Sequence, residues 1–172
     1  MGELKQEYDP LLTEISLPEG TASAKISRGE NYKGFPWMML DHPRYFSGAE
    51  TMAIRSFFWW GHYFSISLQL SGLPKEKAKP RILENFKELR KANYYLCVHK
   101  NPWQHDLGKP YYRSLKKMTE DEFHELITTK EFIKLSKCFS LKKWNKAGRE
   151  MKTAFGEIVE LLRGLDRLRV NK

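Results

Sequence analysis

The chain has 172 residues, 41% of them hydrophobic and 13% aromatic, so it is long enough to bury the core of one ordinary domain. Its two cysteines, Cys97 and Cys138, form no C-x-x-C pair, which argues against a disulfide framework and favours a reducing compartment. The acidic N-terminal stretch lacks the apolar core of a signal peptide, so we expect a cytoplasmic protein with no membrane contact.

The net charge of +9 is unevenly distributed along the chain. Residues 1–24 carry five acidic side chains and one lysine, a net charge of −4, so the remaining residues sum to +13. A basic body favours an anionic partner, although charge can also serve solubility alone. Because residues 16–34 are rich in Ser, Gly and charged side chains, we expect residues 1–34 to form an acidic leader and an irregular arm, followed by a single domain over residues 35–172.

The first regular element is predicted between two prolines. Pro36 and Pro43 each disfavour a helix at the residue before them, so residues 34–46 look extended. We expect a short strand at residues 37–41 and a turn at residues 42–44.

The stretch SFFWWGHYFSISLQLSG, residues 56–72, is the most aromatic part of the chain. Residues 63–71 alternate between apolar and polar side chains, and residues 51–60 alternate less cleanly, which is typical of strands with one buried face. Arg55, His62 and Gln69 interrupt the run and argue against a membrane helix.

The register of this hairpin follows from where its polar residues would fall. A two-residue turn would place Arg55 on the apolar face. A three-residue turn around Gly61 pairs Trp59 with Tyr63 and leaves that face apolar except for Ser56. We therefore predict the three-residue turn, with Gly61 in a left-handed conformation; the alternative is one long strand with a bulge at Gly61.

Helical patterns dominate the second half. Residues 79–93 form an amphipathic pattern, residues 94–100 follow as a strand, and residues 101–112 read as a loop. Thr119 and Glu122 match a capping box, and Thr129 and Ser140 are candidate caps for two further helices.

The longest regular pattern comes last. Apolar residues spaced by three and four predict a helix from residue 141 to about residue 168. Its near-heptad spacing also permits a helix–helix partner, and with it a homo-oligomer. The predicted fold class is α+β: an antiparallel β-sheet with amphipathic helices mainly on one face and a long C-terminal helix.

The polar-aromatic face of the hairpin is the leading candidate site. Aromatic rings and hydrogen-bonding groups on one surface can hold a planar or anionic ligand, unless that face is covered and its rings belong to the core. We predict a non-catalytic binding or accessory protein without a cofactor. The predicted ligand-binding residues are Arg55, Trp59, Tyr63, Gln69 and His99.

Two alternative functions remain open. The first is nucleic-acid binding through basic helices, with Lys75, Lys77, Lys79, Arg81, Lys142, Lys143, Lys146 and Arg149 as the contact residues. The second is a small enzyme using Asp41, His42, His62, His99 or His105. Phosphate-loop, dinucleotide and nucleophile-elbow motifs are missing, and the histidine spacing does not match a metal site, so we predict no metal.

Overall fold

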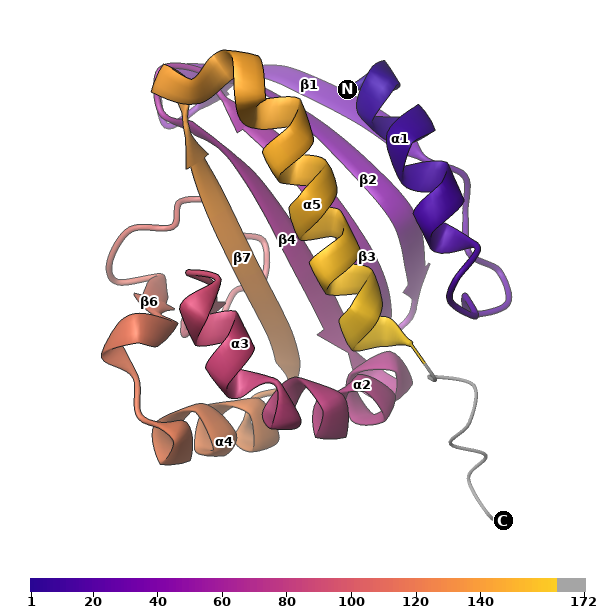
Figure 1. Cartoon of the computed structure of the whole chain (residues 1–172), viewed down its shortest axis with the longest axis vertical. Helices are drawn as coiled ribbons and strands as arrows, with labels where there is room; N and C mark the ends of the chain where they lie inside the picture. The colour runs from indigo at the N-terminus through magenta and orange to yellow at the C-terminus, as the bar shows by residue number, and fades with distance from the viewer. Residues whose placement is uncertain (164–172) are drawn as a thin grey trace.

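A seven-stranded antiparallel sheet forms the centre of the computed structural model, which describes residues 1–163 (Figure 1). The strands are β1 (Lys25–Tyr32), β2 (Phe35–Ser47), β3 (Glu50–Trp59), β4 (Tyr63–Ser71), β5 (Tyr95–Cys97), β6 (Tyr112–Ser114) and β7 (Phe132–Ser140). Their order across the sheet is β1-β2-β3-β4-β7-β5-β6. The helices among the described residues are α1 (Gly2–Leu12), α2 (Gly72–Glu84), α3 (Phe86–Lys91), α4 (Glu120–Thr129) and α5 (Trp144–Leu162). The protein therefore has the predicted α+β fold.

The register of the β3–β4 hairpin is the predicted one. Trp59 pairs with Tyr63 and Arg55 pairs with Ser67, so the turn has three residues. Gly61 has a φ of +73°, the left-handed conformation that glycine adopts without strain. The alternative of one bulged strand is wrong.

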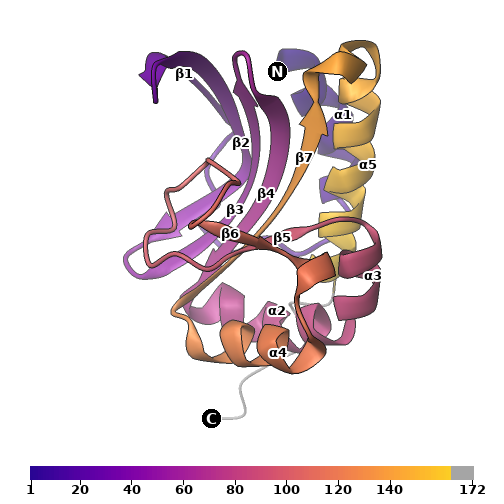
Figure 2. The ribbon, with the colours of Figure 1, turned by 90° about the vertical axis from the view of Figure 1, so that its left-hand side faces the viewer.

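The two faces of the sheet are covered differently. Figure 2 shows α1 and α5 together on one side and the segment between β5 and β6 on the other. The even-numbered residues of β3 and β4, such as Ile54 and Leu68, point to the helices and form the main core. The odd-numbered residues, including the predicted site residues of this hairpin, point to the opposite face.

The N-terminal 34 residues are more ordered than the sequence predicted. Residues 2–12 form α1, and the Tyr8 ring stacks on Phe155 of α5 at 3.8 Å between ring centroids. The Tyr8 hydroxyl lies 3.0 Å from the Ser56 hydroxyl, which satisfies the one polar residue expected on the apolar face. Part of the expected irregular arm is β1, an edge strand. This segment is therefore packed on the sheet.

Other boundaries differ from the sequence-based expectations. The strand predicted at residues 37–41 extends to thirteen residues, because β2 absorbs Pro43 in a register shift between Asp41 and Arg44. The single helix predicted at residues 79–93 is α2 and α3, separated at Asn85.

The capping predictions had mixed outcomes. The capping box of Thr119 and Glu122 is present at the start of α4. A helix after Thr129 is wrong: residues 132–140 form β7, which pairs along its whole length with β4. Ser140 does cap, but it caps a 3₁₀ turn that precedes α5. The long C-terminal helix is α5, and the predicted extension to about residue 168 falls outside the described residues.

The apolar side of α5 is used within this chain. Eight of its residues are buried, and they belong to the main core against the sheet. Within residues 1–163, no helix combines the length and the apolar character needed to cross a bilayer.

Candidate functional site

Residues 98–111, here called the covering segment, lie over the polar-aromatic face of the sheet (Figure 2). Two aromatic residues of the β3–β4 hairpin, Tyr63 and Trp59, hydrogen-bond to the backbone of neighbouring segments. The Tyr63 hydroxyl donates to the carbonyl of His105 at 2.9 Å and accepts from the amide of Leu107 at 2.8 Å. Trp59 Nε1 donates to the carbonyl of Tyr32 at 3.1 Å. Both rings are therefore used inside the protein, where they anchor neighbouring chain segments.

His105 belongs to the covering segment and packs against the sheet below that segment. Its ring stacks on Phe57, with 4.7 Å between ring centroids. Burial, followed by the nearby charges of Lys134 and Arg55, lowers the pKa of His105 to about 2. The imidazole is therefore neutral at every physiological pH and acts as a packing group.

Arg55 forms a buried ion pair with Asp41 across the β2–β3 pairing. Its Nε lies 2.6 Å from Oδ1 of Asp41 and its Nη2 lies 3.0 Å from Oδ2, a bidentate arrangement. The guanidinium also lies 5.4 Å from the centroid of the Trp103 ring in the covering segment. Arg55 thus contacts Trp103 from the sheet side of the covering segment, and the charge of its guanidinium is paired with Asp41.

Lys134 was not predicted from the sequence and is the most deeply buried cationic side chain of this face, with no exposed surface. Its Nζ donates to the carbonyls of Pro102 and Gln104, each at 2.7 Å. Burial, followed by repulsion from Arg55, lowers the pKa of Lys134 to about 7. The side chain therefore fastens the covering segment to β7 at a site where its own charge is costly.

A groove lies beside residues 100–103 of the covering segment. It has a volume of about 710 Å³ and lies among the ends of β3 and β4, the start of α2, the end of α4 and residues 100–103. Gln69 and Thr51 reach it from the sheet, and Trp103, 50% exposed, forms one wall. Its cationic lining residues are Lys75, Lys100 and Lys130, and its acidic ones are Glu76 and Glu131.

Gln69 is the unusual member of this groove. Its side chain is buried, and its Oε1 is one of two buried side-chain polar atoms without a hydrogen-bond partner in the described part of the chain; the other is Nδ1 of His42. Buried amide oxygens are nearly always paired, because leaving one unpaired costs about 1–3 kcal/mol. A donor from outside the protein could complete this site.

The lysines at the groove are partly engaged. Lys75 Nζ donates to the carbonyl of Lys130 at 2.5 Å, and Lys130 Nζ donates to the carbonyl of His99 at 2.9 Å. Lys75 also lies 3.4 Å from the carboxylate of Glu76, whereas Lys130 donates only to carbonyls among the described residues. Because carbonyls do not neutralise an ammonium group, the positive charge of Lys130 still acts on the groove.

The structure brings together four of the five predicted ligand residues on one face. Arg55, Trp59 and Tyr63 lie under or beside the covering segment, and Gln69 is the one that lines the groove. His99 belongs to the covering segment, since β5 ends at Cys97, and its Nδ1 accepts from the amide of Asn101 at 3.0 Å. The rings therefore do not form an open platform.

The residues proposed for an enzyme have separate partners. Asp41 pairs with Arg55, His42 Nε2 lies 2.7 Å from Asp9, and His62 stacks on Trp59. Burial raises the pKa of the Cys97 thiol, which disfavours a thiolate nucleophile. Among residues 1–163, no three His, Cys, Asp or Glu side chains are arranged to hold a metal ion.

The predicted basic residues form two separate groups. Lys75, Lys77, Lys79 and Arg81 are on α2, where Lys75 is buried, Lys79 pairs with Glu76, and Arg81 lies 3.9 Å from Glu160 near the end of α5. Lys142, Lys143, Lys146 and Arg149 are at the start of α5 and are exposed. A 19-residue helix is about 28 Å long, so these groups lie at opposite ends of the molecule.

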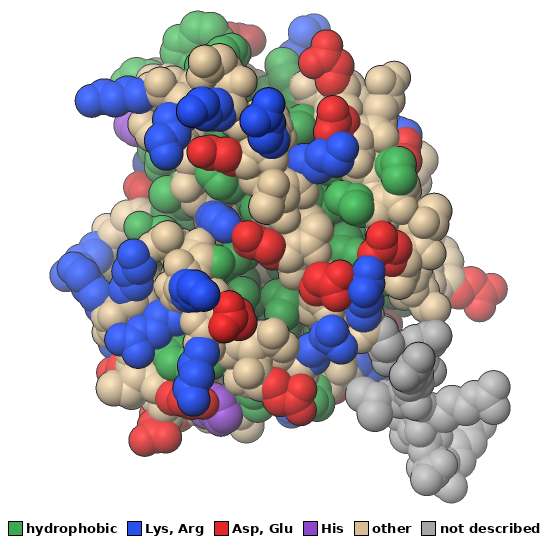
Figure 3. All heavy atoms as spheres, viewed as in Figure 1, with side chains coloured by type: hydrophobic (Ala, Val, Ile, Leu, Met, Phe, Trp, Pro, Cys, Tyr) green, Lys and Arg blue, Asp and Glu red, His purple; other side chains and the backbone are tan. Residues whose placement is uncertain are grey.

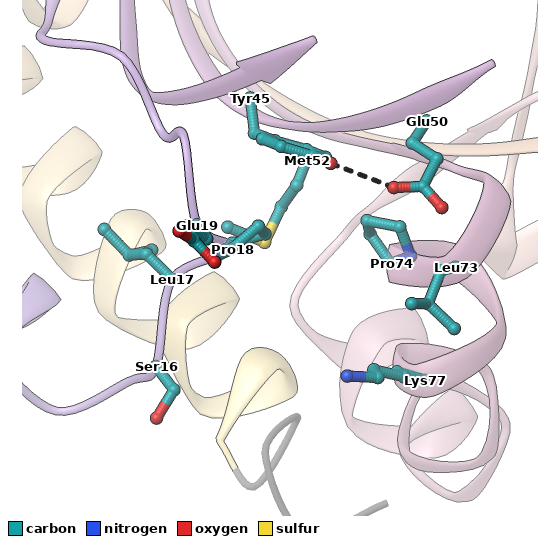
Figure 4. A pocket seen from close by; sticks show the side chains of 10 residues that line it. All are labelled: Ser16, Leu17, Pro18, Glu19, Tyr45, Glu50, Met52, Leu73, Pro74 and Lys77. Carbon is teal, nitrogen blue, oxygen red and sulfur yellow. Dashed lines mark hydrogen bonds between the residues drawn. The ribbon is translucent and has the colours of Figure 1, made fainter. Parts of the chain in front are cut away.

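A second hollow, of about 380 Å³, lies between residues 16–19 and the start of α2 (Figure 4). Met52 and Tyr45 face into it, and the Tyr45 hydroxyl donates to Glu50 at 2.9 Å. The Tyr45 hydroxyl and the Glu50 carboxylate in this hollow thus already satisfy each other, whereas the groove at Gln69 is lined by a residue whose Oε1 has no hydrogen-bond partner among the described residues. We therefore regard the groove as the candidate site.

Comparisons of this chain with protein-family models, with curated proteins and with solved structures found no match.

Proposed function

We propose that this chain is a non-catalytic binding protein that holds a small anionic or planar ligand in the groove at Gln69. The observation that carries the proposal is the buried Oε1 of Gln69, which lacks a hydrogen-bond partner among the described residues and belongs to a residue that lines the groove. A ligand N–H or O–H would satisfy it.

The size and lining of the groove indicate the class of ligand. A volume of about 710 Å³ lies within the range typical of small-molecule sites. Trp103 is 50% exposed, which offers a surface for a flat ring. Lys75, Lys100 and Lys130 give the groove an excess of positive charge over its two carboxylates. A flat anion that also carries a hydrogen-bond donor fits these features best.

The test uses indole-carboxylate and the nucleoside 5′-monophosphates as probes, because each combines a planar ring, a donor and negative charge. Binding is followed by chemical-shift changes of the Gln69 side-chain amide and the Trp103 indole N–H. We expect saturable shifts at these two groups. If none of the probes shifts these two groups at millimolar concentration, the proposal fails.

Gln69→Leu separates binding from folding. Leucine has a similar volume and removes the unpaired oxygen, so we expect the variant to unfold at an equal or higher urea concentration. Ligand affinity should nevertheless fall at least about tenfold, since the ligand donor would be left unpaired. Phe35→Ala, which removes an exposed aromatic ring beside Gly61 in the turn of the β3–β4 hairpin, is the matched control and should leave binding unchanged.

A further inference from the structure

A second surface lies at the other end of the molecule, where the tip of the β3–β4 hairpin meets the start of α5. Trp60 is 57% exposed and Trp144 is 59% exposed. Each packs on Phe58 with 5.4 Å between ring centroids. Single exposed apolar residues are ordinary, but two tryptophans that share one supporting ring form a continuous exposed aromatic patch. We call these three residues the tip patch.

A basic hollow adjoins the tip patch. It has a volume of about 410 Å³ and lies between β7 and α5. Lys143 and Arg149 line it, together with the polar side chains of Ser140, Asn93 and Thr153. Because Lys143 directly precedes Trp144, the hollow and the exposed ring are neighbours on the surface.

The charges around the hollow are only partly neutralised. Lys143 lies 3.8 Å from Glu150, which also lines the hollow, whereas Lys142, Lys146 and Arg149 pair with no carboxylate in the part of the chain that the structure describes. Figure 3 shows Lys and Arg side chains gathered over the first turns of α5. The surface therefore combines exposed rings with an excess of positive charge.

We propose that the tip patch and the basic hollow bind single-stranded nucleic acid. The hollow would hold a backbone phosphate between Lys143 and Arg149, and unpaired bases would stack on Trp144 and Trp60. Stacking on aromatic rings requires bases that are free of a duplex, so the rings select single strands. An anionic membrane would also attract tryptophans and lysines, but a hollow lined by hydroxyl, amide and cationic groups suits a discrete phosphate better than a flat lipid surface.

The experiment measures binding of fluorescein-labelled oligo-dT and oligo-U of 20 nucleotides by anisotropy, at several salt concentrations. We expect affinity to fall with salt, with a log–log slope between about −2 and −3 if three or four phosphates are neutralised. The same strand annealed to its complement should bind at least about tenfold more weakly, because its bases are stacked inside the duplex.

Variants test the rings and the charges separately. Trp144→Ala should weaken binding by about fivefold or more, and Trp144→Phe should recover part of this loss, since a smaller ring still stacks. Lys142→Gln combined with Lys146→Gln should make the salt slope shallower by about 1.4. Phe46→Ala and the exposed pair Lys116→Gln with Lys117→Gln are matched controls, because they remove one exposed ring and two charges that belong neither to the tip patch nor to the lining of the groove; they should bind like the original protein.

Three results would overturn the proposal. They are equal affinity for single strands and duplex, unchanged affinity in Trp144→Ala, and absence of oligonucleotide binding while vesicles rich in phosphatidylserine bind in a Trp144-dependent manner. The last result would assign the surface to membranes.

Discussion

At the scale of single residues, Lys134 shows how this protein uses a buried charge. Its two carbonyl acceptors, Pro102 and Gln104, favour the ammonium form, whereas burial opposes it and lowers the pKa from 10.5 to about 7. Between these two pH values the unfolded chain holds a proton that the folded chain lacks, so stability rises with pH. The cost of keeping Lys134 charged is fully present below pH 7.

We expect Lys134→Met to remove this pH dependence. From pH 7 to pH 8.5, the free energy of unfolding of the original protein should rise by about 1.5 kcal/mol relative to the variant. Urea unfolding of both proteins at the two pH values measures the difference. The titrations stop below pH 9 because burial raises the pKa values of Cys97 and Cys138. At higher pH these two thiols make stability fall with pH, which would oppose the effect of Lys134. Parallel curves for the two proteins would mean that the carbonyls keep Lys134 protonated throughout.

At the scale of elements, the covering segment depends on a few side chains of the sheet. It contains no helix or strand of its own. Lys134, Tyr63 and Tyr112 bind its backbone, with the Tyr112 hydroxyl donating to the carbonyl of Gln104 at 3.0 Å. Such a segment should open locally at a lower free energy than the sheet beneath it.

Tyr63→Phe tests this dependence on a side chain of the sheet. The change removes both hydrogen bonds of the hydroxyl and keeps the ring. We expect the amide of Leu107 to exchange with solvent at least roughly fivefold faster, since one net hydrogen bond contributes about 1 kcal/mol. Amides in the middle of β4 provide the control and should exchange as before. If Leu107 exchanges at the original rate, Tyr63 does not hold the segment closed.

The sequence predicted those elements whose residues interact with close neighbours. The β3–β4 register followed from keeping Arg55 off the apolar face, and the α4 cap followed from residues three positions apart. β7 was missed because Lys134 and Lys137 occupy it, and these are tolerated only through partners far along the chain: Lys137 bonds Glu157 of α5. The groove was missed for the same reason, since no local pattern shows where residues 98–111 lie.

At the scale of the whole molecule, the charge asymmetry of the sequence is partly resolved by the fold. The acidic N-terminal residues lie beside α5, where Glu7 lies 2.8 Å from Lys152 and Glu14 pairs with Arg163. These pairs are exposed and contribute little to stability. Of the basic side chains around the start of α5, Lys143 pairs with Glu150, whereas Lys142, Lys146 and Arg149 pair with no carboxylate among the described residues. Positive potential therefore concentrates at the end of the molecule that carries the tip patch.

The larger role of the N-terminal segment is to complete the core, and this leads to a prediction about its removal. Tyr8, 1% exposed, and Leu12 fill the layer between α5 and the sheet. A chain lacking residues 1–13 would expose the Phe155 ring and leave the Ser56 hydroxyl without its partner. The apolar burial alone is worth about 3–6 kcal/mol, a large share of the 5–15 kcal/mol typical of a domain.

We therefore expect the shortened chain to unfold at a much lower urea concentration than the full chain, or to be partly unfolded without denaturant. Circular dichroism followed through urea titration measures this, with Tyr8→Phe as the control that keeps the ring and costs only about 1–3 kcal/mol for the orphaned Ser56 hydroxyl. An unchanged midpoint in the shortened chain would make α1 a detachable leader, as the composition of the sequence first indicated. A large loss of stability would instead show that the acidic segment and the basic body fold as one unit, because α5 needs Tyr8 of α1 to bury the ring of Phe155.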